Sequence, residues 1–592
     1  MQISLSKDPP PKTEAFDWAS QSWNAKWIED PSWDRQSCHV CAFRRCFTLA
    51  NARTVRVHLS GDQRYTLFLD GKKIGFGPER GDHSNWFYQT HDLRLSSGEH
   101  RIVAVVTWTA VDQGLSHLGH FGHKPSFILH AEGADESLFS TGIADWQVLT
   151  LHGITFTPAQ SFAFCGVGGR TNIEAKLLEL GYETGADNAG IWKPVQNGPN
   201  AFLHAHLLTC FMPTRQLRFS TLPPMYEKII SVGKVRHAQL LETADKVDLV
   251  DFSATRRNSP FESAFQALLN GKAPVEVPAN TTLRILIDVG NYVCAWPMLS
   301  VSGGKDACVK IDWAEALYTD EKHWSKGDRN EVEGKFFFGI GDSFTFDGTA
   351  DRRFEPFWWE AGRYVRLCIT TANEPLTLKT FNLRETHYPH QFESMFSCSD
   401  SRWDNLIKIS KRALEMCSHE TYVDCPYYEQ LMYVGDTRLE ALTTYATTRD
   451  DRLPRKAVYL FDESRDQTGL TLSRTPSIES QIIPPFSLWW VMMVHDYAYW
   501  RNDLAFVRAR MNGVRAVLEA FRANIREDHL VYGLLGWNFT DWVPAWRPAG
   551  IPPDGHRGAN ATINLQFVWV LRAAAELEDL FGEKDLAKRN RK

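Results

Sequence analysis

The residues from Asp424 to Arg438 are the part of the sequence whose types and spacing could do chemistry. They read Asp-Cys-Pro-Tyr-Tyr-Glu-Gln-Leu-Met-Tyr-Val-Gly-Asp-Thr-Arg, so three carboxylates are interleaved with tyrosines and aliphatic groups. Pro426 and Gly435 disfavour regular structure, which predicts a loop between two helices. Because a surface loop is normally polar, the apolar neighbours indicate that the acids line a partly enclosed pocket. A solvated loop with three unremarkable acids is the alternative that spacing alone leaves open.

Carboxylates among aromatic side chains are the functional groups that glycoside cleavage requires. A carboxylic acid kept protonated by an apolar environment can donate its proton to the leaving oxygen. Ionised carboxylates can hold sugar hydroxyls through charge-assisted hydrogen bonds. Tyrosine rings can pack against the apolar face of a sugar. The segment is therefore compatible with a carbohydrate-active site.

Length and composition place this segment in a large globular chain. The 592 residues exceed one core and predict about three or four domains. Hydrophobic residues make up 43% and charged residues 23%, which argues against wholesale disorder. The net charge is −6 and no dense Lys/Arg run precedes the Lys588–Lys592 cluster, so no nucleic-acid partner is expected. The N-terminus has no apolar signal region and no stretch reaches ~18 apolar residues, so we expect a cytoplasmic protein without a membrane partner.

The cysteines do not suggest a disulfide framework. There are eleven, an odd number, scattered over the whole chain, which fits a reducing compartment. Cys38, Cys41 and Cys46 lie close to His39, but a zinc site would need a second ligand pair at matching spacing and none follows. Gly166 to Gly169 is glycine-rich without being a dinucleotide-binding fingerprint. We therefore expect buried strand thiols, no metal and no cofactor.

Alternation of apolar and polar residues predicts two β-rich blocks after a polar tail at residues 1–20. The first block covers residues 21–222 and the second covers residues 223–390, as expected of β-sandwich domains. Asp70-Gly71 is a strong hairpin signal within the first block. The stretch 315–350 is acidic and glycine-rich, and predicts a long loop or a hairpin. The clearest strand patterns lie at residues 55–59, 65–69, 103–107, 285–289, 309–313, 364–369 and 376–383.

At about residue 391 the hydrophobic period changes to that of helices. Val507, Met511 and Val514 begin a regular amphipathic pattern, and the stretch Leu488–Tyr499 is apolar on nearly every side, which requires burial by several neighbours. The last helix carries many apolar residues and only a charged tail follows, so either earlier helices cover it or a packing layer is lacking. Candidate helices lie near residues 400–420, 436–449, 453–465, 486–501, 503–526 and 560–582.

The segment 424–438 resembles the catalytic signature of the family 78 α-L-rhamnosidases, in the form whose general acid lies five residues after the first Asp. The resemblance implies a carbohydrate-binding-like sandwich at 21–222, a second β-rich sandwich at 223–390, and a catalytic (α/α)6 barrel from residue 391. Such a barrel is an α/α toroid, and residues 391–592 offer only about half of its helices, which predicts a truncated domain. Weaker supporting resemblances lie at Trp23–Ile28, Tyr65–Gly75, Val309–Leu317, Phe354–Leu367 and Asn538–Trp542.

The resemblance also implies roles for individual residues. Glu429 would be the general acid that protonates the leaving oxygen. Asp424 and Asp436 would bind rhamnose hydroxyls and shape the electric field around the acid. Asp541 would be either a sugar ligand or a structural hydrogen-bond acceptor. The expected pocket walls are Tyr433, Arg438 and Trp542.

The family inverts configuration, which requires a second carboxylate as general base about 6.5–9.5 Å from the acid. No segment of this sequence matches the family's base motif. Two functions therefore stay open: an inverting hydrolase that releases terminal α-L-rhamnose from rhamnose-containing glycosides or oligosaccharides, and a truncated, non-catalytic protein that binds carbohydrate or has no activity. A lyase or phosphorylase on the same scaffold is a third, weaker alternative, with Tyr427, Tyr428 or Tyr433 as base. The oligomeric state is not predicted.

Overall fold

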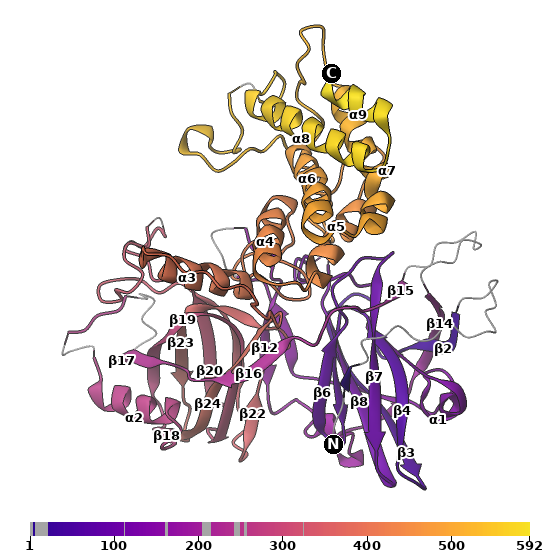
Figure 1. Ribbon diagram of the computed structural model, residues 1–592. Coiled ribbons are helices and arrows are strands. Elements are labelled where there is room, and N and C mark those ends of the chain that lie inside the picture. The colour runs from indigo at the N-terminus through magenta and orange to yellow at the C-terminus, as the bar shows by residue number, and fades with distance from the viewer. Residues whose placement is uncertain are drawn as a thin grey trace. The chain divides into compact units, whose positions relative to one another are not determined.

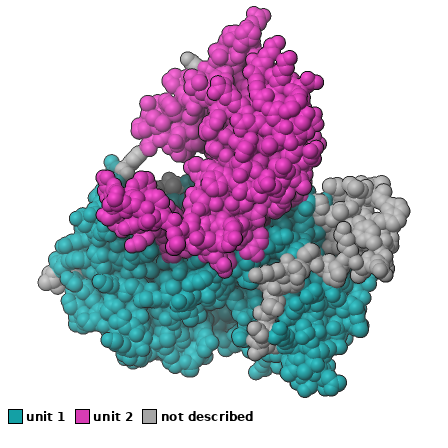
Figure 2. All heavy atoms as spheres, viewed as in Figure 1, with its two compact units in different colours: residues 1–388, 425–430 teal, residues 389–424, 431–592 magenta. Residues whose placement is uncertain are grey.

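The structure is a computed structural model (Figure 1). It describes residues 4–5, 22–111, 113–159, 164–203, 215–241, 249–253, 257–323, 325–553 and 555–592. The chain divides into two compact units, shown in different colours in Figure 2. Unit 1 comprises Met1–Tyr388 and Cys425–Gln430, and unit 2 comprises Pro389–Asp424 and Leu431–Lys592. Apart from Ser4–Leu5, the predicted tail at residues 1–20 lies outside the described residues.

Two sheets of unit 1 pack face to face around one apolar core. Their inner faces meet through alternating residues such as Val57 and Leu59 of one sheet and Phe43 and Leu67 of the other. The first sheet runs in the order β1 (Ser4–Leu5), β7 (Trp86–Leu95), β15 (Gln216–Phe219), β14 (Gln196–Leu203), β2 (Ser22–Glu29), β9 (Ser126–Ala131) and β4 (Arg53–Gly61). The second runs β13 (Lys193–Pro194), β10 (Gln147–Thr150), β3 (His39–Leu49), β8 (Gly98–Trp108), β5 (Arg64–Leu69) and β6 (Lys72–Gly77).

The predicted hairpin at Asp70-Gly71 joins β5 to β6, and Leu69 pairs with Lys72 across it. Both turn residues have positive φ, 52° and 75°, as a two-residue turn of type I′ requires. Asp70 also accepts a hydrogen bond from the backbone N–H of Arg101 at 2.8 Å. This side-chain contact explains why Asp is suited to a position that few residues occupy comfortably.

The third sheet of unit 1 has eleven strands. Its core contains Trp313 and Val365 together with Phe265 and Leu268 of the helix α2 (Ser259–Leu269), which the sequence analysis did not predict. The main path runs β11 (Ile154–Thr157), β12 (Arg170–Glu174), β21 (Ile340–Thr345), β20 (Cys308–Ala314), β23 (Glu360–Thr370), β19 (Thr282–Gly303), β24 (Leu376–His387) and β16 (Tyr226–Ile230). Off this path, β17 (Lys234–Leu241) and β22 (Arg352–Phe354) pair with β19, and β18 (Val275–Val277) pairs with β24.

Two details of this sheet go beyond the sequence pattern. The hairpin β11–β12 precedes residue 222, yet β12 pairs with β21, with Asn172 opposite Ser343. The acidic stretch 315–350 begins as the long loop between β20 and β21, which pair antiparallel, and an isolated bridge joins Tyr318 to Phe336 within that loop. The strand patterns predicted from alternation all fall inside observed strands. The domain boundaries predicted at residues 20, 222 and 390 stay a prediction.

Unit 2 is helical, and all six predicted helices are confirmed. Helix α6 packs against α4, α5, α7 and α8, which accounts for its apolar residues on every side. One face of α8 is covered by α6, whereas Leu565 on another face is 72% exposed. None of the helices in the described part of the chain is long and apolar enough to cross a bilayer. The helices are α3 (Arg402–Met416), α4 (Val434–Thr447), α5 (Arg452–Glu463), α6 (Pro484–Arg501), α7 (Leu504–Arg522), α8 (Ala561–Leu580) and α9 (Lys584–Arg591).

Candidate functional site

The segment 424–438 is divided between the two units. In unit 2, the backbone N–H of Asp424 donates to the carbonyl of Leu431 at 2.8 Å, and the N–H of Leu431 donates to Oδ1 of Asp424 at 3.1 Å. The six residues between them, Cys425–Gln430, belong to unit 1. Of the three acids predicted to act together, Glu429 therefore belongs to unit 1, and Asp424 and Asp436 belong to unit 2.

In unit 1, the two tyrosines that precede Glu429 are held by the third sheet and its loops. The Tyr427 hydroxyl donates to the carbonyl oxygen of Trp313 at 2.7 Å. The hydroxyl of Tyr428 lies 3.2 Å from that of Tyr318. Burial raises the pKa of both Tyr427 and Tyr428 far above the usual value of a phenol. These contacts hold the two tyrosines in place within unit 1.

In unit 2, a group of carboxyls gathers at the beginning of α4. Asp436 lies in the first turn of this helix. Desolvation raises the pKa of Asp436, and the neighbouring carboxylate of Asp541 raises it further. The charges of Asp436 and Asp424 also raise the pKa of a third acid, Glu440. The structure therefore brings Asp424, Asp436 and Asp541 into one electrostatic neighbourhood.

Glu440 was not among the residues predicted from the sequence. It follows Asp436 by four residues on α4, so the two side chains share a helix face. Its Oε2 atom is buried without a hydrogen-bond partner among the described residues. Burial, followed by the charges of Asp436 and Asp424, raises the pKa of Glu440 well above its ordinary value. The spacing of four from Asp436 is the sequence signal that could have identified it.

The predicted pocket walls Tyr433 and Trp542 are linked by a series of aromatic rings. Tyr433 meets Phe486 edge to face at 6.4 Å, Phe486 meets Phe539 at 6.1 Å, and Phe539 meets Trp542 at 5.2 Å. Arg474 donates to the Tyr433 hydroxyl at 2.5 Å. Trp542 is 56% exposed, which leaves its ring available for packing against a sugar.

The side chains of Arg438 and Asp541 make contacts within unit 2 that have a structural role. The Nε of Arg438 donates to Oδ2 of Asp496 at 2.9 Å. The guanidinium of Arg438 lies over the rings of Trp489 and Trp569, at 5.1 Å and 5.4 Å. Arg438 thus joins α4 to α6 and α8. The Oδ1 atom of Asp541 accepts a hydrogen bond from the backbone N–H of Trp542 at 2.7 Å, which is a structural contact.

The first sandwich contains one group of residues that could hold a metal ion, near the predicted cysteine cluster. A carboxylate oxygen of Asp30, a ring nitrogen of His39 and the Cys41 sulfur all lie within 4.8 Å of one another. Asp30 accepts from Thr150 at 2.6 Å and from the N–H of Ser32 at 2.8 Å, and its Oδ2 lies 2.9 Å from His39. These bonds hold the pKa of Asp30 at about 2, whereas burial raises that of the Cys41 thiol. Internal hydrogen bonds account for the arrangement of Asp30 and His39 in the described chain.

Comparisons with known proteins find a similar domain in the second part of the chain. Residues 391–592 match the bacterial alpha-L-rhamnosidase six-hairpin glycosidase domain. No protein among the curated ones matches the sequence. The fold and the matched domain define a glycosidase scaffold of the six-hairpin class, preceded by β-sheet domains, and confirm the predicted fold class. Residues 391–592 are therefore similar to the catalytic domain of bacterial α-L-rhamnosidases.

Solved structures of α-L-rhamnosidases share the fold of this chain at low sequence identity. The family 78 rhamnosidase of Bacillus sp. GL1 superposes with a TM-score of 0.79 at 17% identity, over 97% of this chain and 76% of that one. The α-L-rhamnosidase of Dictyoglumus thermophilum gives 0.66 at 16% identity, over 96% and 58%. The α-L-rhamnosidase of Streptomyces avermitilis, solved with L-rhamnose, gives 0.61 at 16% identity, over 94% and 48%. The chain thus spans between about half and three quarters of the length of these relatives.

Proposed function

We propose that the protein is an inverting glycoside hydrolase that cleaves terminal α-L-rhamnose from rhamnose-containing glycosides, with Glu429 as the general acid. The observation that carries this proposal is the intact segment 424–438 inside the matched glycosidase domain. The relative from Streptomyces avermitilis, which was solved with L-rhamnose, supports the choice of sugar. The proposal assigns no general base.

The environments of the acids support a division of labour. Glu429 donates its proton to the glycosidic oxygen as the bond breaks, and water attacks the opposite face of the sugar. Asp424 and Asp436 accept hydrogen bonds from rhamnose hydroxyls. Trp542, with its exposed ring, packs against the apolar face of the sugar or of the group attached to it. Asp541, whose charge raises the pKa of Asp436, either accepts a hydrogen bond from a sugar hydroxyl or stabilises the loop that carries Trp542 through its hydrogen bond from the Trp542 backbone N–H.

The test is to measure the dependence of turnover on the leaving group in the wild-type chain and in Glu429→Gln. Without an acid, alkyl rhamnosides should lose about 10²- to 10⁴-fold in kcat, because the alkoxide needs a proton to depart. 2,4-Dinitrophenyl α-L-rhamnoside should lose far less, because its phenolate leaves without protonation. Glu527→Gln, an exposed glutamate of unit 2, is the matched control and should keep wild-type turnover of both substrates.

Either of two results would overturn the proposal. The first is the absence of turnover of both rhamnosides by folded, monodisperse wild-type protein, which would favour the non-catalytic, carbohydrate-binding alternative. The second is an equal loss of both substrates in Glu429→Gln, which would remove Glu429 from the acid role.

A further inference from the structure

Gln430, the residue after Glu429, has an unusual backbone conformation. Its φ is +55°, in the left-handed region that residues with a side chain rarely occupy. Such a conformation costs on the order of 1–3 kcal/mol and persists only where the surroundings determine it. Gln430 is only 2% exposed, so these surroundings are the protein itself.

The side chain of Gln430 uses both ends of its amide within unit 1. Its Oε1 accepts from the indole N–H of Trp358 at 2.7 Å and lies 3.2 Å from Nε2 of His117. Its Nε2 donates to the carbonyl of Pro426 at 2.9 Å. These partners orient the amide in one way only.

The proton on His117 is also defined by its neighbours. The backbone N–H of Gly119 donates to Nδ1 of His117 at 2.9 Å, so the ring proton must be on Nε2, which then donates to Gln430. Burial, assisted by the positive charge of Arg80, lowers the pKa of His117 well below 6.5. His117 is therefore a neutral donor of fixed tautomer at neutral pH.

The backbone on both sides of Glu429 is held as well. Arg80 donates to the carbonyl of Gln430 at 2.7 Å. The N–H of Gln430 donates to the carbonyl of Cys425 at 2.9 Å, and Gly166 donates to the carbonyl of Tyr428 at 2.7 Å. With the residues before and after it fixed, Glu429 has little freedom to change the position of its Cα.

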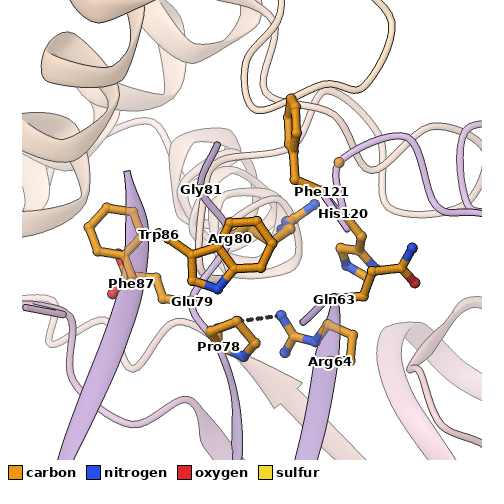
Figure 3. Close-up of a pocket in the computed structure, with 11 residues that line it drawn as sticks. Gln63, Arg64, Pro78, Glu79, Arg80, Gly81, Trp86, Phe87, His120 and Phe121 are labelled. Carbon is orange, nitrogen blue, oxygen red and sulfur yellow. Dashed lines mark hydrogen bonds between the residues drawn. The ribbon is translucent and has the colours of Figure 1, made fainter. Parts of the chain in front are cut away.

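The residues that hold Gln430 come from different parts of unit 1. Arg80 follows β6, His117 lies between β8 and β9, and Trp358 lies between β22 and β23. His120 stacks on His117 at 4.2 Å and meets Trp358 edge to face at 4.6 Å. Figure 3 shows Arg80 and His120 in the wall of a small pocket, where Arg64 donates to the carbonyl of Pro78. The buried positions of these side chains are thus set by the β sheets rather than by the helical unit.

We propose that Arg80, His117 and Trp358, acting through Gln430, are positioning residues that aim the Glu429 carboxyl at the glycosidic oxygen. We name these three residues the Gln430 clamp. The inference rests on the proposed function, because it requires Glu429 to act as the acid. It assigns to unit 1 a role in catalysis, because residues of unit 1 fix Glu429, the proposed general acid.

The experiment uses the full chain with Gln430→Met and Trp358→Phe. Gln430→Met removes both the accepting oxygen and the donating N–H of the amide while keeping a side chain of similar volume. Trp358→Phe removes the indole N–H that donates to Gln430 while keeping an aromatic ring. Because a displacement of about 1 Å can cost ~10²-fold in rate, we expect each variant to lose tenfold or more in kcat on methyl α-L-rhamnoside. Turnover of 2,4-dinitrophenyl α-L-rhamnoside and KM should stay near wild type. The matched control is Trp33→Phe. In the wild type the indole N–H of Trp33 donates to the carbonyl of Ser37 at 2.9 Å, in a different part of unit 1.

The outcomes separate this inference from the proposed function. Selective loss on the methyl rhamnoside supports the clamp, and retained dinitrophenyl turnover shows that the variants are folded. An equal loss on both substrates in both variants would mean a purely structural role and would overturn the inference. If Glu429→Gln is selective while both clamp variants match wild type, only the clamp is wrong. If the wild-type chain turns over neither substrate, the proposed function and the clamp are both wrong.

Discussion

At the scale of single residues, the acids of this chain differ through their environments rather than through their chemistry. Asp30 has a pKa of about 2 because three hydrogen bonds stabilise its charge. Glu440 has a strongly raised pKa because its Oε2 is buried and Asp436 and Asp424 repel a further negative charge. The same functional group thus has a lowered pKa where hydrogen bonds stabilise its charge and a raised pKa where burial and neighbouring charges oppose it.

We predict that Glu440→Gln stabilises unit 2 at neutral pH. The folded-state pKa of Glu440 is raised, so the folded protein binds more protons than the unfolded chain, and the contribution of Glu440 to stability falls as pH rises from its unfolded pKa. A neutral amide does not titrate. Urea unfolding of the wild type and the variant should therefore agree closely near pH 4 and diverge in favour of the variant towards pH 7.

Glu527→Gln serves as the control for this prediction, since Glu527 is exposed. It should leave the free energy of unfolding unchanged at both pH values. A difference between wild type and Glu440→Gln that is the same at pH 4 and pH 7 would show that Glu440 does not titrate abnormally.

At the scale of elements, β15 is joined to the first sheet by a buried ion pair. Arg215 immediately precedes β15 and donates to Oδ2 of Asp62 at 2.9 Å, and both side chains are buried. The guanidinium also lies 3.8 Å from the ring centre of Trp27 and donates to Ser126 at 2.5 Å. Burial raises the pKa of Asp62 to about 6 in spite of the arginine. The pair therefore stabilises the sandwich only as long as both partners are present.

We predict that Arg215→Met lowers the free energy of unfolding of unit 1 by about 3–5 kcal/mol at pH 8, because it leaves the Asp62 carboxylate buried without its cation. The measurement is chemical denaturation followed by circular dichroism. The double variant with Asp62→Asn should recover part of the loss, since the uncompensated charge is gone. Equal losses in the single and double variants would mean that packing of Arg215 on Trp27, not the ion pair, holds β15 in place.

The elements themselves could largely be predicted from the sequence, because their signals are local. The periods of Val55–Leu59 and Val507–Val514 identify β4 and α7 without knowledge of their partners. The pairing of β12 with β21 could not be predicted, since it joins residues separated by a long stretch of chain. The same limit applies to the Gln430 clamp: Arg80, His117 and Trp358 carry no motif, and only the fold brings them together.

The candidate site was predictable where the resemblance supplied a motif and less so elsewhere. Asp424, Asp436 and Asp541 lie in one electrostatic neighbourhood, and their assignment as sugar ligands stays a prediction. Glu440 was missed because a glutamate on a helix is normally exposed, and only the packing around α4 shows that its Oε2 is buried. The role of each residue in catalysis stays a prediction.

At the scale of the whole molecule, the chain has two compact units with separate cores. The core of unit 1 is built from sheets, with Phe43 and Phe127 stacked at 6.3 Å. That of unit 2 is built from helices, with Phe521 of α7 stacked on Phe567 of α8 at 5.3 Å. Units with cores of their own can unfold independently, so we predict two thermal transitions in calorimetry.

Two substitutions assign these transitions. Phe521→Ala removes a fully buried ring from unit 2 and should cost about 3–5 kcal/mol, which lowers the Tm of one transition. Arg215→Met should lower the Tm of the other. The six residues Cys425–Gln430 are covalently part of the helical stretch but belong to unit 1, so Arg215→Met should also reduce turnover of alkyl rhamnosides near its lowered transition while the unit 2 transition is still intact. A single transition that both substitutions shift equally would show that the chain unfolds as one cooperative body, and that the division into two units has no thermodynamic counterpart.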